Sequence, residues 1–301
     1  MPISKMGKPI IHKQVSNEQR QTHETRKSLF VGLEKELQRP VITFFTSFTQ
    51  PVMIEDADAD MLEGVLRKTD LSKGLALIIS SPGGSGLAAE RIINICRSYS
   101  GTKEYFAVVP GKAKSAATMI CLGASKIMMG SSSELGPIDP QVTLTEDNRA
   151  KIFSAFNLVE SYNELFSKAV KEKGNLQPYL QQLANYDERE IKEMKSAMAL
   201  SEDIAVRTLL SGMMVGKSET EIKKKIDIFL TPKRTKTHGR PIYREEASEC
   251  CGLNIESVDV KSKFWELAYE LYYRTNNYVS SSFAKCIESK EHSFAAGIRK
   301  G

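Results

Sequence analysis

Two short apolar runs, each followed by a tight turn and a helical pattern, dominate the first half of the chain. Leu75–Ser80 is apolar and ends in a Ser-Pro-Gly-Gly-Ser turn at residues 81–85, after which apolar residues fall at helical spacing. Tyr105–Val109 is a second apolar run, followed by a turn over residues 110–115 and a small apolar helix beginning at Ala116. Apolar runs of this length, bounded by glycine and proline, are typical of buried strands. We therefore expect two parallel strands that each deliver a turn to the same edge of a sheet.

The alternation of strand and helix patterns extends back towards the N-terminus. A helix is predicted over residues 16–38, opened by a capping box of Ser16 and Gln19. Residues 41–48 are rich in β-branched and aromatic side chains and predict the first core strand, and a helix follows the acidic segment 55–60. Because strand and helix alternate, the sequence predicts an α/β fold with a parallel sheet covered by helices.

Long amphipathic helical patterns replace this alternation in the second half of the chain. Two of them cover residues 148–173 and 187–214, and a capping box of Ser218 and Glu221 opens a third. Residues 263–290 form a last helical pattern with an aromatic stripe. Together these helices offer more apolar surface than one sheet covers, so we expect a homo-oligomer.

The changes of pattern divide the chain into three predicted parts. Pro40 ends the first helix and marks the first boundary. The parts are an N-terminal arm and helix at residues 1–40, a core at 41–258 with a helical insertion at about 148–230, and a C-terminal helical extension at 259–301.

Ser115 stands where the second apolar strand gives way to a helix, a position that suits acyl transfer. The first turn of a helix leaves backbone N–H groups unpaired, and the helix dipole there favours negative charge. The Ala116 N–H is therefore a candidate oxyanion donor. Gly84 can supply a second donor because a glycine lets the backbone approach a substrate closely. The alternative is that the glycine turn is an ordinary loop and Ser115 an ordinary helix N-cap.

Three motifs in this order resemble the Clp protease/crotonase superfamily. They are SPGGSG at residues 81–86, GKAKSAATMICLGA at 111–124 and SELGPIDPQ at 133–141. The resemblance is closest to the serine dehydrogenase proteinase family, related to signal peptide peptidase A, and covers roughly residues 41–258. It implies a spiral of ββα units with a parallel sheet, plus extra N- and C-terminal helices. It also implies Ser115 as the nucleophile, with the backbone amides of Gly84 and Ala116 as the oxyanion hole.

The serine also needs a base, which is usually histidine, or a lysine in peptidases of the signal peptide peptidase type. His238 lies within the region of resemblance, whereas the other three histidines, His12, His23 and His292, do not lie in its core. By the same resemblance, Asp139 occupies the place of the Clp-type triad histidine and His238 that of the triad aspartate. Triads are recognised by geometry and not by chain order, so we predict Ser115, His238 and Asp139 as the catalytic residues.

A lysine base is the alternative to His238. Lys114 adjoins Ser115, and Lys112 could lie along the groove that binds the substrate. Lysines further along the chain are possible counterparts of the signal peptide peptidase lysine: Lys168, Lys171, Lys173, Lys192 and Lys195. The spacing of the sequence does not single out one of these lysines. His238 could also be an ordinary surface residue, as a histidine beside a glycine often is.

Three functions from different classes follow. The first, which we expect, is a serine peptidase that cleaves peptides or unfolded chains through a Ser115 acyl-enzyme. The second is a crotonase-like acyl-CoA enzyme, for which a well-placed carboxylate pair is missing. The third is a non-catalytic scaffold of the same fold. Reaction of Ser115 with a fluorophosphonate separates the first function from the other two.

Composition limits the class of protein and its expected location. The chain has 301 residues, 41% of them hydrophobic and 26% charged, and no apolar run approaches the length of a membrane span. Its first residues lack the apolar stretch of a secretory signal, so the expected location is cytoplasmic. The five cysteines form no C-x-x-C pair and indicate neither a disulfide framework nor a zinc site. We expect no metal and no cofactor.

The net charge of +5 is concentrated in lysines and arginine at residues 223–225 and 233–236. This cluster lacks interleaved aromatic residues that could stack on bases, so a solvated surface is favoured over a nucleic-acid site. The chain has no GxxxxGK[ST] motif, so any unfoldase partner would be a separate protein.

Overall fold

A seven-stranded sheet forms the centre of the molecule, with the strand order β11-β10-β1-β2-β3-β5-β9. The computed structural model describes residues 10–18, 22–146 and 149–297. Five neighbouring strands are parallel: β1 (Val41–Thr46), β2 (Leu75–Ser80), β3 (Tyr105–Val109), β5 (Lys126–Met129) and β9 (Ile255–Ser257). At the β1 edge, β10 (Lys285–Glu288) and β11 (Ser293–Ala296) are added antiparallel. The predicted parallel α/β sheet is confirmed, with an antiparallel edge that the sequence did not predict.

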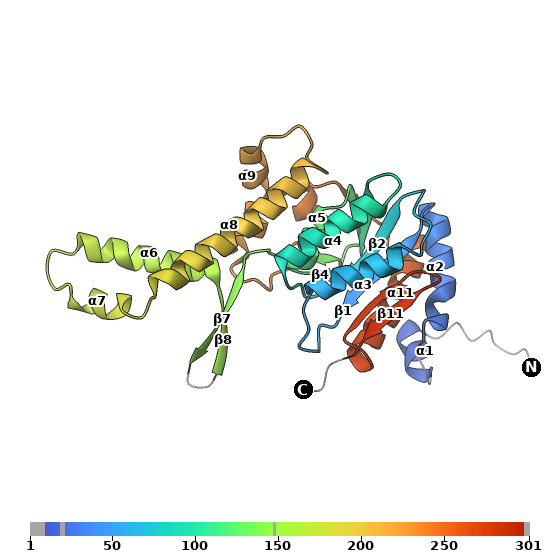
Figure 1. Cartoon of the computed structure of the whole chain (residues 1–301), viewed down its shortest axis with the longest axis horizontal. Helices are drawn as coiled ribbons and strands as arrows, with labels where there is room; N and C mark the ends of the chain where they lie inside the picture. The colour runs from blue at the N-terminus through green and yellow to red at the C-terminus, as the bar shows by residue number, and fades with distance from the viewer. Residues whose placement is uncertain (1–9, 19–21, 147–148, 298–301) are drawn as a thin grey trace, which may run out of the picture.

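Helices cover both faces of this sheet (Figure 1). One face carries α2 (Glu24–Leu37) and α11 (Lys263–Ser281), and the other carries α3 (Asp56–Leu66), α4 (Gly86–Tyr99) and α5 (Ala116–Leu122). Side chains alternate between the two layers along each strand, so Phe45 packs with the first group and Phe44 with the second. Because both faces are covered, the central strands are continuous apolar runs, which is the pattern that identified them in the sequence.

An arm of helices with a hairpin at its base projects from one side of the sheet (Figure 1). The hairpin is formed by β7 (Gln141–Glu146) and β8 (Arg149–Ser154), and the helices of the arm are α6 (Ala155–Lys171), α7 (Gln177–Leu183) and α8 (Glu188–Leu210). Val159, Ile191 and Met194 are buried in a small core within the arm. The C-terminal half of α8 returns to the main core, where Ile204 and Leu209 are buried. The arm is therefore joined to the sheet both through the hairpin base and through α8.

Shorter elements complete the chain. They are α1 (Ile11–Asn17), β4 (Lys112–Ala113), β6 (Glu134–Leu135), α9 (Glu219–Leu230), α10 (Pro232–Thr235) and a π-helix at Glu246–Cys250. β4 and β6 pair in parallel outside the main sheet. The predicted capping box at the start of α9 is confirmed, because the Ser218 hydroxyl accepts from the Glu221 N–H and the Glu221 carboxylate accepts from the Ser218 N–H.

The helix predicted over residues 16–38 is two helices, α1 and α2. Ser16 lies inside α1, where its hydroxyl donates to the His12 carbonyl oxygen at 2.8 Å, so it does not open a helix. Gln19, the other member of the predicted capping box, lies outside the described residues. Residues 16–28 contain no apolar residue, so the apolar spacing behind the prediction covered only α2 and said nothing about the first half of the range.

Two further predicted helices are shorter than expected, because part of each is a strand. Residues 149–154 pair with β7, so Ile152 lies on β8 and not on a helix, and α6 begins only at Ala155. The start of that prediction, Asn148, lies outside the described residues. At the C-terminus, α11 ends at Ser281 and the chain returns as β10 beside β1. The central sheet therefore continues across the boundary predicted at residue 259.

Candidate active site

The glycine turn at the carboxyl end of β2 is held by hydrogen bonds on two sides. The buried Ser81 hydroxyl accepts from the Gly83 N–H at 3.1 Å and also bonds the Thr46 hydroxyl. On the other side, the Ile54 N–H donates to the Gly83 carbonyl oxygen and the Ser85 N–H donates to the Ile54 carbonyl oxygen, each at 2.8 Å. Hydrogen-bonding groups alternate sides along an extended segment, so the N–H of Gly84 points away from Ile54.

Two glycines are required in this turn for steric reasons. Gly83 has a φ of +106°, and a Cβ there would lie 2.6 Å from both the Lys114 carbonyl oxygen and the Ser115 Cβ. A Cβ on Gly84 would lie 2.3 Å from the backbone N and O of Ile54. The absence of a side chain thus lets Gly83 lie against Ser115 and lets Gly84 lie against the backbone of Ile54.

Ser115 is the N-cap residue of α5, at the strand-to-helix turn where the sequence placed it. Its φ of 51° and ψ of −121° lie in a region that residues other than glycine rarely adopt. Its hydroxyl makes no capping hydrogen bond with its own helix, in contrast to an ordinary serine N-cap. Within the described residues, the N–H of Ala116 also has no acceptor. Strained backbone of this kind is common at functional sites, where the surrounding structure maintains it.

Ser115 and His238 line the same cavity, which has a volume of about 740 Å³. Gly83, Gly84 and Ala116 also line it, so the serine and the two residues that carry the candidate oxyanion amides border one space. Most of the other lining residues are apolar, and they include Phe48, Val52, Met53, Leu87, Met119, Ile138, Ile152, Leu200 and Ile204. The cavity therefore combines a small polar group of candidate residues with extended apolar walls.

His238 and Asp139, which are 99 residues apart in sequence, are in contact. Nδ1 of His238 lies 2.7 Å from Oδ1 of Asp139. The carboxylate is fully buried, whereas the imidazole side chain is 24% exposed. A carboxylate can only accept here, so Nδ1 carries the proton and Nε2 is left as the acceptor. This is the tautomer that a general base requires.

Local backbone contacts bring the two segments together. The Leu135 N–H and carbonyl oxygen each bond Ile242 at 3.0 Å, which holds the loop that carries His238 against β6. The Ile138 N–H donates to the Phe229 carbonyl oxygen at 2.7 Å and fixes the segment that carries Asp139. Asp139 itself lies in irregular backbone between β6 and β7, where the proline residues around it disfavour a ladder.

The Ser115 hydroxyl and His238 share the cavity, and no hydrogen bond joins them among the described residues. Catalytic hydrogen bonds are often long or poorly aligned without substrate and tighten when it binds. The geometry of the free protein is therefore compatible with a base that engages the serine in the complex.

The candidate lysines are placed elsewhere. Nζ of Lys114 lies 2.8 Å from the Glu134 carboxylate and donates to the Leu135 carbonyl oxygen at 3.1 Å. Burial lowers the pKa of Lys114, although Glu134 opposes that shift. Lys112 is exposed on β4, and the other five candidates lie on α6, on α8 or next to α6. No lysine is found among the described residues that line the cavity.

Two residues that the sequence did not single out also bind Asp139. The Ser154 hydroxyl donates to Oδ2 at 2.7 Å, and the Gln141 side-chain amide donates to the same oxygen at 2.9 Å. Gln141 begins β7 and Ser154 ends β8, so the two residues face each other at the base of the hairpin. Since the hairpin itself was not predicted, no pattern in the sequence pointed to this contact.

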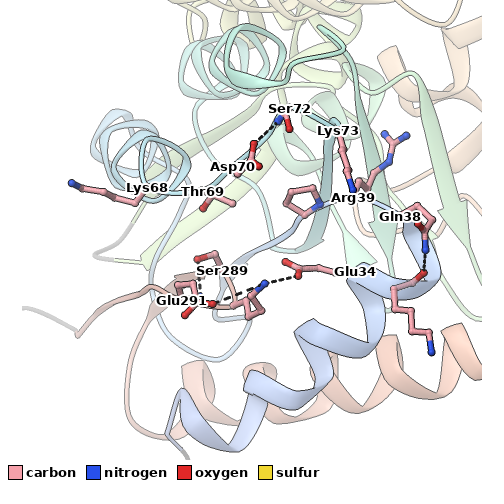
Figure 2. Close-up of a pocket in the computed structure, with 13 residues that line it drawn as sticks. Glu34, Gln38, Arg39, Lys68, Thr69, Asp70, Ser72, Lys73, Ser289 and Glu291 are labelled. Atoms are coloured by element: carbon pink, nitrogen blue, oxygen red, sulfur yellow. Dashed lines mark hydrogen bonds and ion pairs between the residues drawn. The ribbon is translucent and has the colours of Figure 1, made fainter.

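A second cavity, of about 520 Å³, lies near the amino end of β1, away from these residues (Figure 2). Polar groups there bond one another: Nζ of Lys290 lies 3.1 Å from the Glu34 carboxylate, and the Asp70 carboxylate accepts from the Ser72 N–H at 3.0 Å. None of the predicted site residues lines this cavity. Across the described part of the chain, no group of three or more His, Cys, Asp or Glu side chains is placed to hold a metal ion.

A parallel α/β core that presents a strained serine beside a glycine turn is the arrangement expected for a protein of the Clp protease class. The model of the ClpP-like SDH-type serine proteinase family matches residues 10–287. The chain belongs to this family, which confirms both the resemblance and the Clp protease/crotonase-like fold class expected from the three sequence motifs. At the level of the family, the assignment supports a serine peptidase.

Two curated relatives come from Methanocaldococcus jannaschii. Uncharacterized protein MJ0137 is 30% identical over 72% of this chain and 63% of its own length. Uncharacterized protein MJ1495 is 26% identical over 83% of this chain and 69% of its own length. The chain thus spans about two thirds of the relatives that it matches.

Similar solved structures include two variants of the 1510-N membrane-bound stomatin-specific protease. The first has a TM-score of 0.41 and 13% identity, over 69% of this chain and 76% of its own. The second, in complex with a substrate peptide, has a TM-score of 0.29 and 15% identity, over 74% of this chain and 94% of its own. In the present chain, none of the helices within the described ranges is both long and apolar enough to cross a membrane.

Proposed function

We propose that this protein is a serine peptidase that cleaves peptide bonds through an acyl-enzyme on Ser115, with His238 as the general base and Asp139 as its orienting partner. The observation that carries the proposal is the 2.7 Å contact between His238 Nδ1 and Asp139 Oδ1 beside the cavity that Ser115 lines. A surface histidine has no need of a buried carboxylate partner, whereas a general base does.

The proposed reaction gives each of these groups one role. Nε2 of His238 takes the proton from the Ser115 hydroxyl as Oγ attacks the carbonyl carbon of the scissile peptide. The N–H groups of Gly84 and Ala116 bind the oxyanion of the tetrahedral intermediate, and Asp139 stabilises the imidazolium. His238 then gives its proton to the leaving amine. A water molecule, activated by the same imidazole, hydrolyses the acyl-enzyme and restores Ser115.

Peptides or unfolded chains are the substrates that the cavity walls favour. Several large apolar side chains that line the cavity are exposed, among them Met53 at 62%, Leu87 at 58% and Ile152 at 68%. Exposed apolar side chains gathered in one cavity commonly mark a binding site. An extended chain can cover them while its backbone reaches Gly84 and Ala116.

Reaction with a fluorophosphonate tests the proposal. We expect mass spectrometry of the wild-type protein to locate the adduct on Ser115, and Ser115→Ala to be unreactive at that position. His238→Ala should lower the labelling rate by several orders of magnitude, about 10³- to 10⁶-fold, as removals of triad members do. Asp139→Asn should lower it by up to about 10⁴-fold, because it leaves the imidazole in the wrong tautomer.

The control for His238→Ala is His292→Ala, the same change at an exposed histidine outside the cavity. It should label like the wild type. Undiminished labelling of His238→Ala would reject the triad and return the search to a lysine base. A wild-type protein that does not react at Ser115 would reject the serine peptidase and leave the non-catalytic scaffold and the crotonase-like enzyme.

We also propose that the protein forms a homo-oligomer. The helices of the arm expose large apolar side chains that no other described part of the chain covers, such as Phe166 at 51% and Val170 at 69%. A second copy of the chain is the simplest partner for such a surface. A cytoplasmic location and a separate unfoldase stay predictions from the sequence.

A further inference from the structure

Among the described residues, the carboxylate of Asp139 has three hydrogen-bond donors, of which His238 is only one. Oδ1 bonds Nδ1 of His238 at 2.7 Å, whereas Oδ2 accepts from the Ser154 hydroxyl at 2.7 Å and from the Gln141 amide at 2.9 Å. The terminal torsion of an aspartate is broad, so a carboxylate held at one oxygen can turn about it. Two donors on Oδ2 hold the plane of the carboxylate and so the direction in which Oδ1 faces.

Ser154 bonds Asp139 in place of the helix end that a serine at its position usually caps. It is the N-cap residue of α6, with extended backbone angles of φ −69° and ψ 128°. A serine in this position normally accepts a hydrogen bond from an N–H in the first turn of its helix. Here the side chain makes no such bond, and the hydroxyl donates to Asp139 instead. The side chain therefore serves the carboxylate and not the helix end.

Gln141 approaches the same oxygen from the other strand of the hairpin. Gln141 and Ser154 are register partners at the hairpin base, and the Ala155 N–H donates to the Pro140 carbonyl oxygen at 2.9 Å. Ser154 is 8% exposed and Gln141 is exposed, so the serine bond is the better shielded of the two. Hydrogen bonds to a buried ionised group are among the stronger ones in proteins.

From this geometry we propose that Ser154 and Gln141 are positioning residues, which hold Asp139 so that its Oδ1 fixes the Nδ1–H tautomer and ring orientation of His238. The inference rests on the proposed function, and it adds that the base of the arm orients the catalytic imidazole. Ser154 is the main contributor, because its hydroxyl is close, buried and otherwise uncommitted. Groups that orient a ligand or catalytic side chain from behind typically contribute about 10- to 100-fold.

The test compares Ser154→Ala with Ser154→Thr by two measurements. The first is the Nδ1–H proton resonance of His238 in protein labelled with ¹⁵N-histidine, which is assigned by its absence in His238→Ala. The second is the rate of fluorophosphonate labelling of Ser115. In Ser154→Ala we expect the resonance to shift or broaden and the rate to fall about 10- to 100-fold. Ser154→Thr keeps a hydroxyl and should restore both.

Ser218→Ala is the matched control, since it removes a serine from the N-cap of α9, far along the chain from Asp139. It should lower the melting temperature and leave both readouts unchanged. Gln141→Ala removes the second donor and should change both readouts in the same direction as Ser154→Ala but less, and it provides the test if Ser154→Ala does not fold.

The outcomes separate this inference from the proposed function. If Ser154→Ala keeps the wild-type resonance, the positioning role is overturned, whether or not stability or the labelling rate falls. A Ser154→Thr protein that behaves like Ser154→Ala would overturn it as well. If the wild type does not label at Ser115, the proposed function fails, and the resonance still decides whether Ser154 positions the Asp139–His238 pair.

Discussion

Replacing Gly83 by alanine tests whether the glycine turn sets the position of Ser115. A Cβ at this site would lie 2.6 Å from the Ser115 Cβ and from the Lys114 carbonyl oxygen, whereas ordinary contacts begin at 3.4 Å. The difference, 3.4 − 2.6, means that the two segments must separate by about 0.8 Å. In Gly83→Ala, the glycine turn and Ser115 cannot both keep the positions that they have in the wild type.

The structure allows the size of the effect to be worked out. The φ of +106° at Gly83 is unfavourable for alanine by about 1–3 kcal/mol. Forcing the extra methyl group between packed segments adds about 1–3 kcal/mol. The unfolding free energy should therefore fall by roughly 2–6 kcal/mol, or about 3–10 °C in melting temperature for a chain of 301 residues. A displacement of nearly 1 Å at a reacting group costs about 10²-fold in rate.

Thermal unfolding and the rate of fluorophosphonate labelling of Ser115 measure the two effects. Gly64→Ala is the control, because Gly64 is an exposed residue inside α3 with nothing within 4 Å of an added Cβ. Alanine is a better helix former there by about 1 kcal/mol, so Gly64→Ala should be slightly more stable and should label at the wild-type rate. A Gly83→Ala protein with wild-type melting and labelling would refute the idea that close contact with the turn positions Ser115.

Two further predictions concern stability and assembly. Glu288 accepts from Arg26 at 2.6 and 2.8 Å with both side chains fully buried, so Glu288→Gln should cost about 3–5 kcal/mol in urea unfolding. Burial opposes ionisation of Glu288, but the hydrogen bonds from Arg26 and Ser293 outweigh it and lower its pKa. The contribution of this carboxylate is therefore full above the unfolded pKa of about 4.3 and is lost as pH falls through the folded pKa, so the wild type should lose more stability than Glu288→Gln between pH 5 and 3. For the proposed homo-oligomer, light scattering should give a mass above the 33.6 kDa of one chain, and a monomer at micromolar concentration would contradict it.

Strands β2 and β3 could be predicted from the sequence because helices cover both faces of the sheet. Complete burial makes each strand an unbroken apolar run, and the tight turns that follow need glycine or proline. The position of Ser115 follows from the same local signals. The pairing of Asp139 with His238 could be predicted only with the help of the family resemblance, because nothing in the periodicity of the sequence relates the two residues.

The hairpin and the antiparallel edge could not be predicted in this way. β8 has mostly exposed side chains, so its strand character depends on pairing with β7 and not on a buried face. β10 has only four residues and follows a long helix closely, so the helical pattern before it dominated the prediction. Asp147 and Asn148, which the sequence places between β7 and β8, are a turn signal that could have divided the predicted helix.

The two members of the proposed acid–base pair are held to very different degrees, and this determines where the orientation of the imidazole comes from. His238 lies in a loop that is bonded to the core at Leu135 and Ile242, and its side chain is 24% exposed. Asp139 is fully buried and bonded at both oxygens. Because Asp139 is the more firmly held of the two, the direction of Nε2 of His238 depends on the Asp139 carboxylate more than on the loop that carries His238. Since that carboxylate is held from the hairpin base, the positioning role proposed for Ser154 makes the orientation of the imidazole depend on the pairing of β7 with β8.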